Sequence, residues 1–461
     1  MVVSVSNEIA IQQPSPSIQA WCKKNLIIPN PEYAKKRRMG KWVGNTPKDL
    51  QLYKVIGDTY YLPYGVLSEI KPLIGDYSEN FPELRTVNYD CEIPLYDYQE
   101  VAKDEILKHD FGVLQSKAGS GKTQIGVAII AQLGCRALWL THTKDLLTQS
   151  KERASEYMDS SLFGEITDGK VNIGKGITFA TVQTLAKQDT SIYKDAFDCV
   201  IVDECHRVAG TPTSVTQFGK VLSSLNCRYK YGLSATVHRA DGLIKTMFAY
   251  LGNIAYTVPD KAIADKVMTV FVVGRATHTE VSEACLDTDG TLLYQKLINY
   301  LVTNTRRNFL IADDLAKNAE HYNLVLSDRI EHLKTLMSML PEELCVMITG
   351  KMTTKKGKLE RKTALDDMRS GRKRYLFATY KLAKEGLDIP RLDRLYLTTP
   401  QKDYAIVVQS VGRIARIFEG KSDPICYDYV DSIGYLIGSY KKRCSHYRKS
   451  GCQILGGVFD D

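Results

Sequence analysis

The sequence predicts an α/β protein with two parallel-sheet domains in tandem and a small N-terminal domain. Short apolar strands alternate with helix-length amphipathic stretches from about residue 91 to about residue 258, and a second run of the same kind follows. Strands that alternate with helices predict a parallel sheet covered by helices. Residues 1–90 differ, because they are rich in tyrosine, proline and turn-forming residues, and they predict an accessory domain.

The expected strands are short and apolar. In the first run they are 112–114, 137–140, 177–180, 199–202 and 231–234; in the second they are 267–273, 323–326, 345–348, 375–378 and 394–398; two more are 53–56 and 59–62. The predicted boundaries are an N-terminal accessory domain at 1–90, a first α/β domain at 91–262, a second at 263–435 and a basic C-terminal tail at 436–461.

The composition is that of an ordinary globular protein. Of the 461 residues, 44% are hydrophobic and 25% are charged, which excludes collagen-like and wholly disordered classes. The eleven cysteines contain no C-x-x-C pair, so we expect free thiols in a reducing compartment. No apolar run approaches the roughly 20 residues of a membrane span, and the N-terminus has no secretory signal. The predicted location is the cytoplasm, or the nucleic-acid-containing compartment of a host, without secretion or membrane contact.

The net charge of +8 is compatible with a nucleic-acid partner but does not establish one. Basic residues outnumber acidic ones in 351–375 and in 432–450. A separate run of four consecutive basic residues extends from Lys35 to Arg38. Such runs are usually solvated faces. The tail around 440–449 interleaves aromatic and basic residues, which is typical of strand-binding grooves but equally of an amphipathic helix docked on the second domain.

A glycine loop lies between an apolar strand and an apolar helix. Its members are Ser116, Lys117, Ala118, Gly119, Ser120, Gly121, Lys122 and Thr123. The glycines let backbone N–H groups close around phosphate oxygens, Lys122 reaches the β and γ phosphates, and the Thr123 hydroxyl binds Mg²⁺. The full pattern has glycine in place of Ser116, so a glycine turn opening an ordinary helix stays an alternative for this segment alone.

Two adjacent acids follow the apolar strand 199–202. Ligands of parallel sheets bind outside the carboxyl ends of the strands, so Asp203 and Glu204 are expected near the glycine loop. Asp203 would hold the magnesium ion, largely through water, and Glu204 would polarise the attacking water. The alternative is an acid pair that caps the next helix. It is less favoured here, because the pair follows an apolar strand and comes after a glycine loop in the chain.

A series of further segments in order resembles the superfamily 2 helicases and translocases of the D-E-x-H type, over roughly residues 91–431. The segments are 95–99, 118–123, 140–147, 180–185, 203–206, 232–236, 325–328, 348–350, 377–390 and 409–416. Within the superfamily, G-L-S-A-T-V-H-R-A-D-G at 232–242 is similar to the group of XPB, RadD, UvsW and the motor subunits of type III restriction enzymes. The resemblance implies two RecA-like domains that hydrolyse ATP, with Mg²⁺, in the cleft between them.

The resemblance also implies roles for individual residues. Those expected at the nucleotide are Gln99, Gly119, Ser120, Gly121, Lys122, Thr123, Gly386 and Asp388, with Lys122, Asp203, Glu204, Gln409, Arg413 and Arg416 catalytic. Those expected to couple hydrolysis to motion are His206, Ser234 and Thr236. Arg413 and Arg416 stand three apart and would share one helix face as arginine fingers, while Gln409 would orient the attacking water.

Nucleic acid is the implied partner, with DNA favoured over RNA. Contacts to phosphate and sugar are expected from Thr143, Lys144, Thr181, Gln183, Thr349, Gly350, Lys351 and Thr379. Hydroxyl and backbone N–H groups read phosphate and sugar without sequence information, so binding should tolerate any sequence. The basic stretch that follows Gly350 should make this binding weaken with salt.

The predicted function is an ATP-dependent helicase or translocase that acts on duplex or branched DNA. Two alternatives remain at this point: a nucleotide-regulated binding or loading subunit, which could recruit a protein through residues 1–90, and the motor of a restriction or defence complex. In the second alternative the nuclease would be a separate chain, since the expected domains leave no room for one after residue 435.

Overall fold

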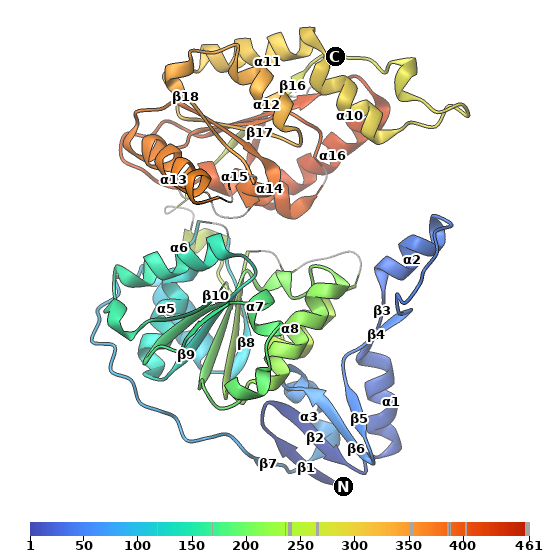
Figure 1. Ribbon diagram of the computed structural model, residues 1–461, viewed down its shortest axis with the longest axis vertical. Coiled ribbons are helices and arrows are strands. Elements are labelled where there is room, and N and C mark those ends of the chain that lie inside the picture. The colour runs from blue at the N-terminus through green and yellow to red at the C-terminus, as the bar shows by residue number, and fades with distance from the viewer. Residues whose placement is uncertain are drawn as a thin grey trace. The chain divides into compact units, whose positions relative to one another are not determined.

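The computed structural model confirms the α/β fold class, with two extended parallel sheets (Figure 1). It describes residues 1–117, 119–167, 169–235, 237, 242–263, 267–350, 352, 354–384, 387, 389–401 and 403–456. The chain divides into two compact units, one made almost entirely of residues up to Ala262 and the other of residues from Ile263 onward. Among the described residues, no helix combines the length and apolar character needed to cross a bilayer.

The first unit opens with a small α/β domain. Its five-stranded sheet has the order β5 (Lys54–Ile56), β6 (Thr59–Pro63), β2 (Glu8–Gln12), β1 (Val2–Val5) and β7 (Ser78–Glu79). Inward residues alternate along β1 and β2, where Val3, Val5, Ile9 and Ile11 are buried, as a half-buried sheet requires. The helices α1 (Pro16–Asn25) and α3 (Leu67–Ile74) contribute to the same core.

A two-stranded ribbon carries a helix away from this small domain. The ribbon pairs β3 (Ile27–Pro29) with β4 (Asp49–Gln51), and α2 (Pro31–Arg38) follows β3 at its outer end (Figure 1). Asn30 caps α2 by accepting a hydrogen bond from Glu32 N, and Pro31 occupies the first helical turn, where proline is favoured.

The first large sheet has eight strands. Their order is β11 (Lys170–Asn172), β10 (Gly164–Thr167), β12 (Ile177–Thr181), β9 (Ala137–Thr141), β13 (Cys199–Asp203), β14 (Tyr229–Ser234), β8 (Phe111–Gln115) and β15 (Ile254–Thr257). All neighbours pair in parallel except β10 and β11. The helices are α4 (Asp97–Leu107), α5 (Lys122–Leu133), α6 (Lys144–Ser155), α7 (Val182–Ala186), α8 (Pro212–Ser224) and α9 (Ile244–Leu251).

The second unit contains a seven-stranded, fully parallel sheet among its described residues. The order is β18 (Cys345–Ile348), β19 (Tyr375–Thr379), β17 (Asn323–Ser327), β20 (Arg394–Leu397), β21 (Ile425–Val430), β16 (Phe271–Ala276) and β22 (Gln453–Leu455). Its helices are α10 (Tyr294–Thr303), α11 (Thr305–Lys317), α12 (Ile330–Met337), α13 (Lys355–Ser370), α14 (Tyr380–Lys384), α15 (Tyr404–Ile414) and α16 (Gly434–Lys449).

Two parts of the second unit differ from the sequence prediction. The strand expected at 267–273 begins at Phe271, and Val267 makes only an isolated bridge to Arg416. The aromatic side chains of the tail lie inside: Tyr440 and Tyr447 are buried in α16, and β22 adds a strand to the sheet. The docked helix is therefore the correct alternative for this segment, because its aromatic rings face the core rather than a strand-binding groove.

Candidate ATP site and nucleic-acid surface

The glycine loop follows β8 and leads directly into α5. Gly119 and Gly121 have φ angles of +87° and +75°, a left-handed backbone that glycine adopts at little cost. Lys122 begins α5, and its ammonium group lies 3.3 Å from the carbonyl oxygens of both Ser116 and Lys117. Ser120 is buried within the loop. A strand, a turn of this conformation and a helix N-terminus together form a phosphate-binding arrangement.

Gln99 lies against this loop from the first turn of α4. Its Oε1 accepts a hydrogen bond from Tyr96 N at 2.9 Å, which fixes the side-chain amide at the start of the helix. The amide is so close to Gly121 that a Cβ on that glycine would overlap Gln99 Nε2. Glycine at 121 is therefore required for its φ angle and also for the space that Gln99 fills.

Asp203 ends β13 and Glu204 follows it, and this strand is two positions away from β8 in the sheet. Asp203 is buried, and burial and the neighbouring Glu204 carboxylate raise its pKa to about 6, while Lys122 acts in the opposite direction. Ser150 Oγ donates to Asp203 Oδ2 at 3.2 Å, and Glu204 N donates to Asp203 Oδ1 at 2.9 Å. A cation beside Asp203 would offset the cost of its buried charge.

Glu204 has a left-handed backbone with φ +48°, which is uncommon for a residue with a side chain. Such strained conformations cluster at functional sites, where surrounding contacts hold them. His206 Nδ1 lies 3.2 Å from Glu204 Oε2 and 3.0 Å from Ser234 Oγ at the end of β14. His206 thus links the acid to Ser234. Thr236, the third residue expected here, lies outside the described residues.

The residues of this site fit Mg²⁺ and a nucleoside triphosphate. Magnesium prefers oxygen ligands, and the Asp203 carboxylate and the Thr123 hydroxyl supply them, with Thr123 next to Lys122 on the first turn of α5. The ammonium of Lys122 is held by two neutral carbonyl oxygens, so a phosphate would give it a far stronger partner.

Four of the residues expected to contact nucleic acid lie at the carboxyl ends of β9 and β12. These two strands are parallel neighbours, and their pairing extends from Ala137 opposite Ile177 to Thr141 opposite Thr181. Thr143 caps α6, and Lys144 is exposed at its first turn. Thr181 ends β12 and is mostly buried, while Gln183 Nε2 lies 2.9 Å from His142 Nδ1. Two of the four, Thr143 and Lys144, therefore present a hydroxyl and a cation at the surface.

In the second unit, Thr349 and Gly350 follow β18, and Thr379 ends the adjacent strand β19. They lie at the same edge of that sheet, because parallel neighbours end together. Thr349 is largely buried, and Thr379 is partly exposed. Lys351 lies outside the described residues.

The remaining catalytic candidates lie on and after α15. Gln409 is buried, and its Oε1 has no hydrogen-bond partner among the described residues. The Arg413 guanidinium donates to the carbonyl oxygens of Ala383 and Leu387, both at 3.1 Å. The expectation that Arg413 and Arg416 share a helix face is wrong, because α15 ends at Ile414. Gly386 and Asp388 lie outside the described residues.

Ser150 and His142 were not anticipated from the sequence. Ser150 reaches Asp203 from α6, although 53 positions separate the two residues in the chain, and His142 bonds Gln183 and stacks on Phe218 with ring centroids 6.3 Å apart. A lone serine in a helix carries no pattern that would mark it. His142 falls in a segment that the resemblance had already marked, so its position was a usable signal.

Two family models match the chain. Residues 92–239 match the model described as type III restriction enzyme, res subunit, and residues 305–418 match the helicase conserved C-terminal domain. The two matches fall on the two large sheets and include the phosphate loop, the acid pair, Arg413 at the end of α15 and Arg416 just after it.

Several curated proteins are similar in sequence. "Putative ATP-dependent RNA helicase L396" of Acanthamoeba polyphaga mimivirus is 28% identical over 73% of this chain. The match covers 64% of that relative, so this chain spans less than two thirds of the relative's length. The DNA 3'-5' translocase XPB2 of Sulfurisphaera tokodaii is 25% identical over 78% of this chain and 84% of its own length. The ATP-dependent DNA helicase uvsW of Enterobacteria phage T4 is 23% identical over 86% of this chain and 83% of its own.

Solved structures share the fold. S. cerevisiae Dbp5 bound to RNA and ADP BeF3 covers 86% of this chain and 94% of its own, with a TM-score of 0.56 and 16% identity. A fragment of a putative HsdR subunit of a type I restriction enzyme from Vibrio vulnificus matches over 73% of this chain and 65% of its own, with a TM-score of 0.54 and 19% identity. Both large sheets, the ordered motifs and these similarities lead to one conclusion: the chain belongs to the superfamily 2 helicases.

Proposed function

We propose that this chain is an ATP-dependent DNA helicase or translocase that acts on duplex or branched DNA. The observation that carries the proposal is the position of Asp203 and Glu204 at the carboxyl end of β13, two strands from the phosphate loop after β8. In this arrangement Asp203 and Thr123 would hold Mg²⁺, and Lys122 and the loop backbone would hold the phosphates. Mg²⁺ supplies charge neutralisation at the transferred phosphate.

Glu204 would accept the proton of the attacking water. Its carboxylate has a fixed position because its backbone is locked at φ +48° and its Oε2 lies 3.2 Å from His206 Nδ1. The contact between His206 and Ser234 would then couple a change at Glu204 during hydrolysis to the end of β14. Gln409, whose buried Oε1 lacks a partner among the described residues, would orient the water, and Arg413 and Arg416 would stabilise the transition-state charge.

The nucleic-acid strand would lie along the carboxyl edges of the sheets. Thr143 and Lys144 after β9, Gln183 after β12, and Thr349 and Thr379 in the second unit supply hydroxyl, amide and cationic groups suited to phosphate and sugar. The similarity to XPB2 and uvsW, which are named for DNA, supports DNA as the track. The mimivirus relative is named for RNA, so the proposal of DNA needs its own test.

A strand-displacement assay tests the proposal. Purified chain is mixed with a forked DNA duplex, a blunt DNA duplex or a forked RNA duplex of the same sequence, with ATP or a non-hydrolysable analogue. We expect ATP-dependent release of the labelled strand from forked DNA, and none with the analogue. Displacement confined to RNA would contradict the choice of DNA, and displacement of no substrate, together with turnover stimulated only by a protein, would favour a loading subunit.

A further inference from the structure

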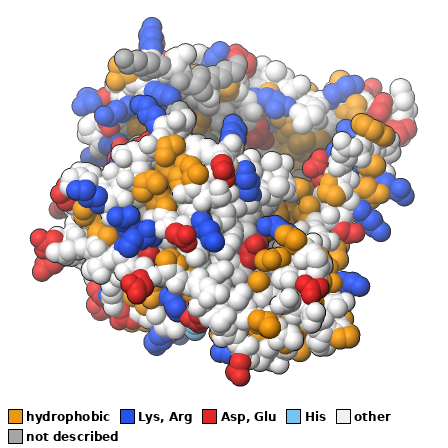
Figure 2. Space-filling view, turned by 60° about the horizontal axis from the view of Figure 1, so that its bottom comes forward, with side chains coloured by type: hydrophobic (Ala, Val, Ile, Leu, Met, Phe, Trp, Pro, Cys, Tyr) orange, Lys and Arg blue, Asp and Glu red, His pale blue; other side chains and the backbone are white. Residues whose placement is uncertain are grey.

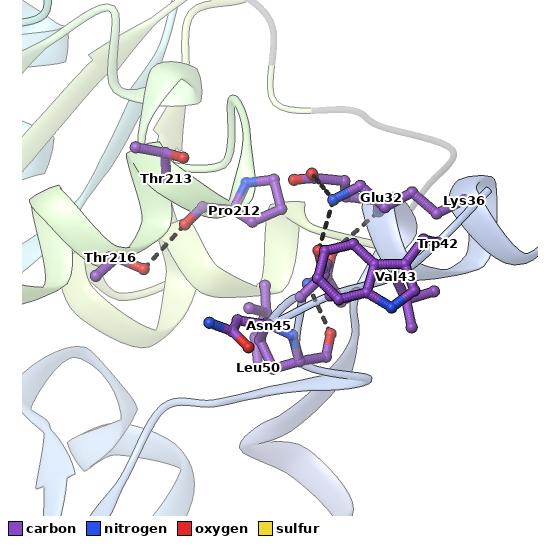
Figure 3. Close-up of a pocket in the computed structure, with 13 residues that line it drawn as sticks. Glu32, Lys36, Trp42, Val43, Asn45, Leu50, Pro212, Thr213 and Thr216 are labelled. Carbon is purple, nitrogen blue, oxygen red and sulfur yellow. Dashed lines mark hydrogen bonds and ion pairs between the residues drawn. The ribbon is translucent and has the colours of Figure 1, made fainter.

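A projecting arm on the first unit has the features of a second ligand site. The arm comprises residues 30–48, which are α2 and the loop that returns to β4 (Figure 1). Together with the start of α8 it lines an open surface pocket with a volume of about 400 Å³ (Figure 3). The pocket does not involve the phosphate loop or the acid pair.

Trp42 is the principal feature of the arm. It is 88% exposed, more than any other large hydrophobic side chain among the described residues, and it lines the pocket. Its ring lies against Gly44, where a Cβ would come within 2.9 Å of the ring. One exposed aromatic ring is ordinary by itself, but Trp42 borders a surface pocket and presents a large planar face to a ligand there.

Hydrogen bonds within the arm connect its loop to α2. Asn30 Nδ2 donates to Pro47 O at 2.9 Å, and Lys36 Nζ donates to Thr46 Oγ1 at 2.6 Å, so the C-terminal end of the loop is tied to α2 and its cap (Figure 3). Lys36 also pairs with Glu32 at 3.0 Å. These bonds fix the base of the loop that carries Trp42, which lowers the ordering cost of binding a ligand.

The charge of the arm favours a polyanion. The basic residues between positions 23 and 48 are Lys23, Lys24, Lys35, Lys36, Arg37, Arg38, Lys41 and Lys48, and Glu32 is the single acid in that stretch. Lys35, Arg37 and Arg38 are exposed and have no acidic partner among the described residues. In Figure 2, basic, apolar and some acidic side chains lie at the right-hand edge of the face, the side to which α2 projects in Figure 1.

The polar groups of the pocket suit the edge of a base. Asn45 lines the pocket, and its amide makes no hydrogen bond to another described residue. Across the pocket, Pro212, Thr213 and Thr216 belong to the start of α8, and Thr213 is exposed (Figure 3). An aromatic face beside a cluster of cations is typical of sites that bind single-stranded nucleic acid, and the Asn45 amide adds a polar group beside that face.

We propose that the arm and the start of α8 bind an unpaired nucleobase, with Trp42 as the stacking surface and Lys35, Arg37 and Arg38 on the flanking phosphates. The inference rests on the proposed function in one respect, which is that nucleic acid is the ligand. It adds an accessory contact that would hold a displaced or unpaired strand outside the motor core. Because the base stacks rather than pairs, the site should tolerate any sequence.

Binding of labelled oligothymidylate to the full chain, without nucleotide, tests the site. We expect Trp42→Ala to weaken binding about tenfold, as loss of one stacked base does, and Trp42→Phe to restore most of it. The matched control is Phe309→Ala, which removes another exposed aromatic ring, on α11, and should leave binding unchanged. Thermal unfolding of each variant checks that the fold is intact.

Two further ligands separate base from backbone. A strand of abasic sites keeps the phosphates and lacks the bases, so wild type and Trp42→Ala should bind it equally. Replacing Lys35, Arg37 and Arg38 together by glutamine should weaken binding of both strands and lower the slope of log affinity against log salt by about two. Oligouridylate run in parallel shows whether the site accepts RNA as well as DNA.

The inference is overturned if Trp42→Ala binds oligothymidylate as tightly as wild type, or if it weakens the abasic strand to the same extent. Failure of the proposed function would look different. In that case no nucleic acid would stimulate ATP turnover by the wild-type chain, whether or not the arm binds a strand.

Discussion

At the residue scale, the main feature of the site is the buried carboxylate of Asp203, whose charge lowers the stability of the fold unless a cation lies beside it. Asp203 is 5% exposed, and its pKa is raised to about 6 by burial and by Glu204. Because this pKa lies above its ordinary value of 3.8, the folded state binds the proton more tightly than the unfolded state between about pH 4 and pH 6. Stability contributed by this group therefore falls as pH rises through that window and stays low above it.

Asp203→Asn should accordingly raise the melting temperature of the chain measured without nucleotide or Mg²⁺. The gain should be largest above pH 6 and should shrink towards pH 4, where the aspartate is protonated as well. Asp198→Asn is the matched control, since Asp198 is equally buried but pairs with Arg85 at 2.9 Å, and its loss should lower the melting temperature. A difference between wild type and Asp203→Asn that did not change with pH would contradict the assignment.

The position of a residue in the fold could be predicted from the sequence where a pattern marks that residue. The glycine loop and the acid pair lie where parallel-sheet topology puts them, since both occupy turns at the carboxyl ends of strands. Ser150 could not be found in this way, because its contact with Asp203 depends on how α6 packs and not on a local pattern. The exposure of Trp42 likewise depends on the path of the arm.

At the element scale, α16 is held to the second unit by a buried ion pair. Arg443 donates to Asp428 through Nε at 2.7 Å and through a terminal nitrogen at 2.8 Å, and Tyr447 Oη donates to the same carboxylate at 2.8 Å. The basic, aromatic composition of the tail favoured nucleic-acid binding and docking equally. Burial distinguishes the two alternatives: Arg443 is only 2% exposed, so it is docked and not available to nucleic acid. Composition alone does not reveal this burial.

Arg443→Gln should lower the free energy of unfolding by about 3 kcal/mol, because it leaves the Asp428 charge buried without its partner. Lys442→Gln is the control one position away, on the exposed side of α16, and should change stability by less than about 0.5 kcal/mol. Urea unfolding of the three proteins measures both effects. Equal, small effects of the two substitutions would mean that α16 does not dock through this ion pair.

At the scale of the whole molecule, the N-terminal domain and the first large sheet share one core. Buried residues of β1 and β2 belong to the same hydrophobic cluster as Val113, Leu138 and Val200 of the large sheet. Lys230 Nζ, which is buried, donates to Asn7 O at 3.3 Å and to Leu222 O at 3.0 Å, and it lies 5.2 Å from the Tyr64 ring centroid. The sequence identified residues 1–90 as different in composition, but this shared core depends on long-range packing.

Gly65→Ala tests that docking. A Cβ at Gly65 would overlap the backbone nitrogen of Gly252 and crowd the carbonyl oxygens of Phe248 and Ala249. Because backbone yields less than a flexible side chain, we expect a loss of about 2 kcal/mol or more and faster proteolysis of the connecting segment 80–96. Gly438→Ala, on the exposed surface of α16 with open space around it, should be neutral or slightly stabilising. Unchanged proteolysis of Gly65→Ala would show that the domain can shift without undocking.

The central claim is that ATP hydrolysis at the Asp203–Glu204 site is driven by a nucleic-acid track, and steady-state ATP turnover as a function of strand length tests it most directly. We predict turnover that is low without nucleic acid, rises with DNA and increases with strand length. Glu204→Gln should bind ATP but lose most turnover on every strand. Turnover that is indifferent to every nucleic acid, or that survives Glu204→Gln, would contradict the account.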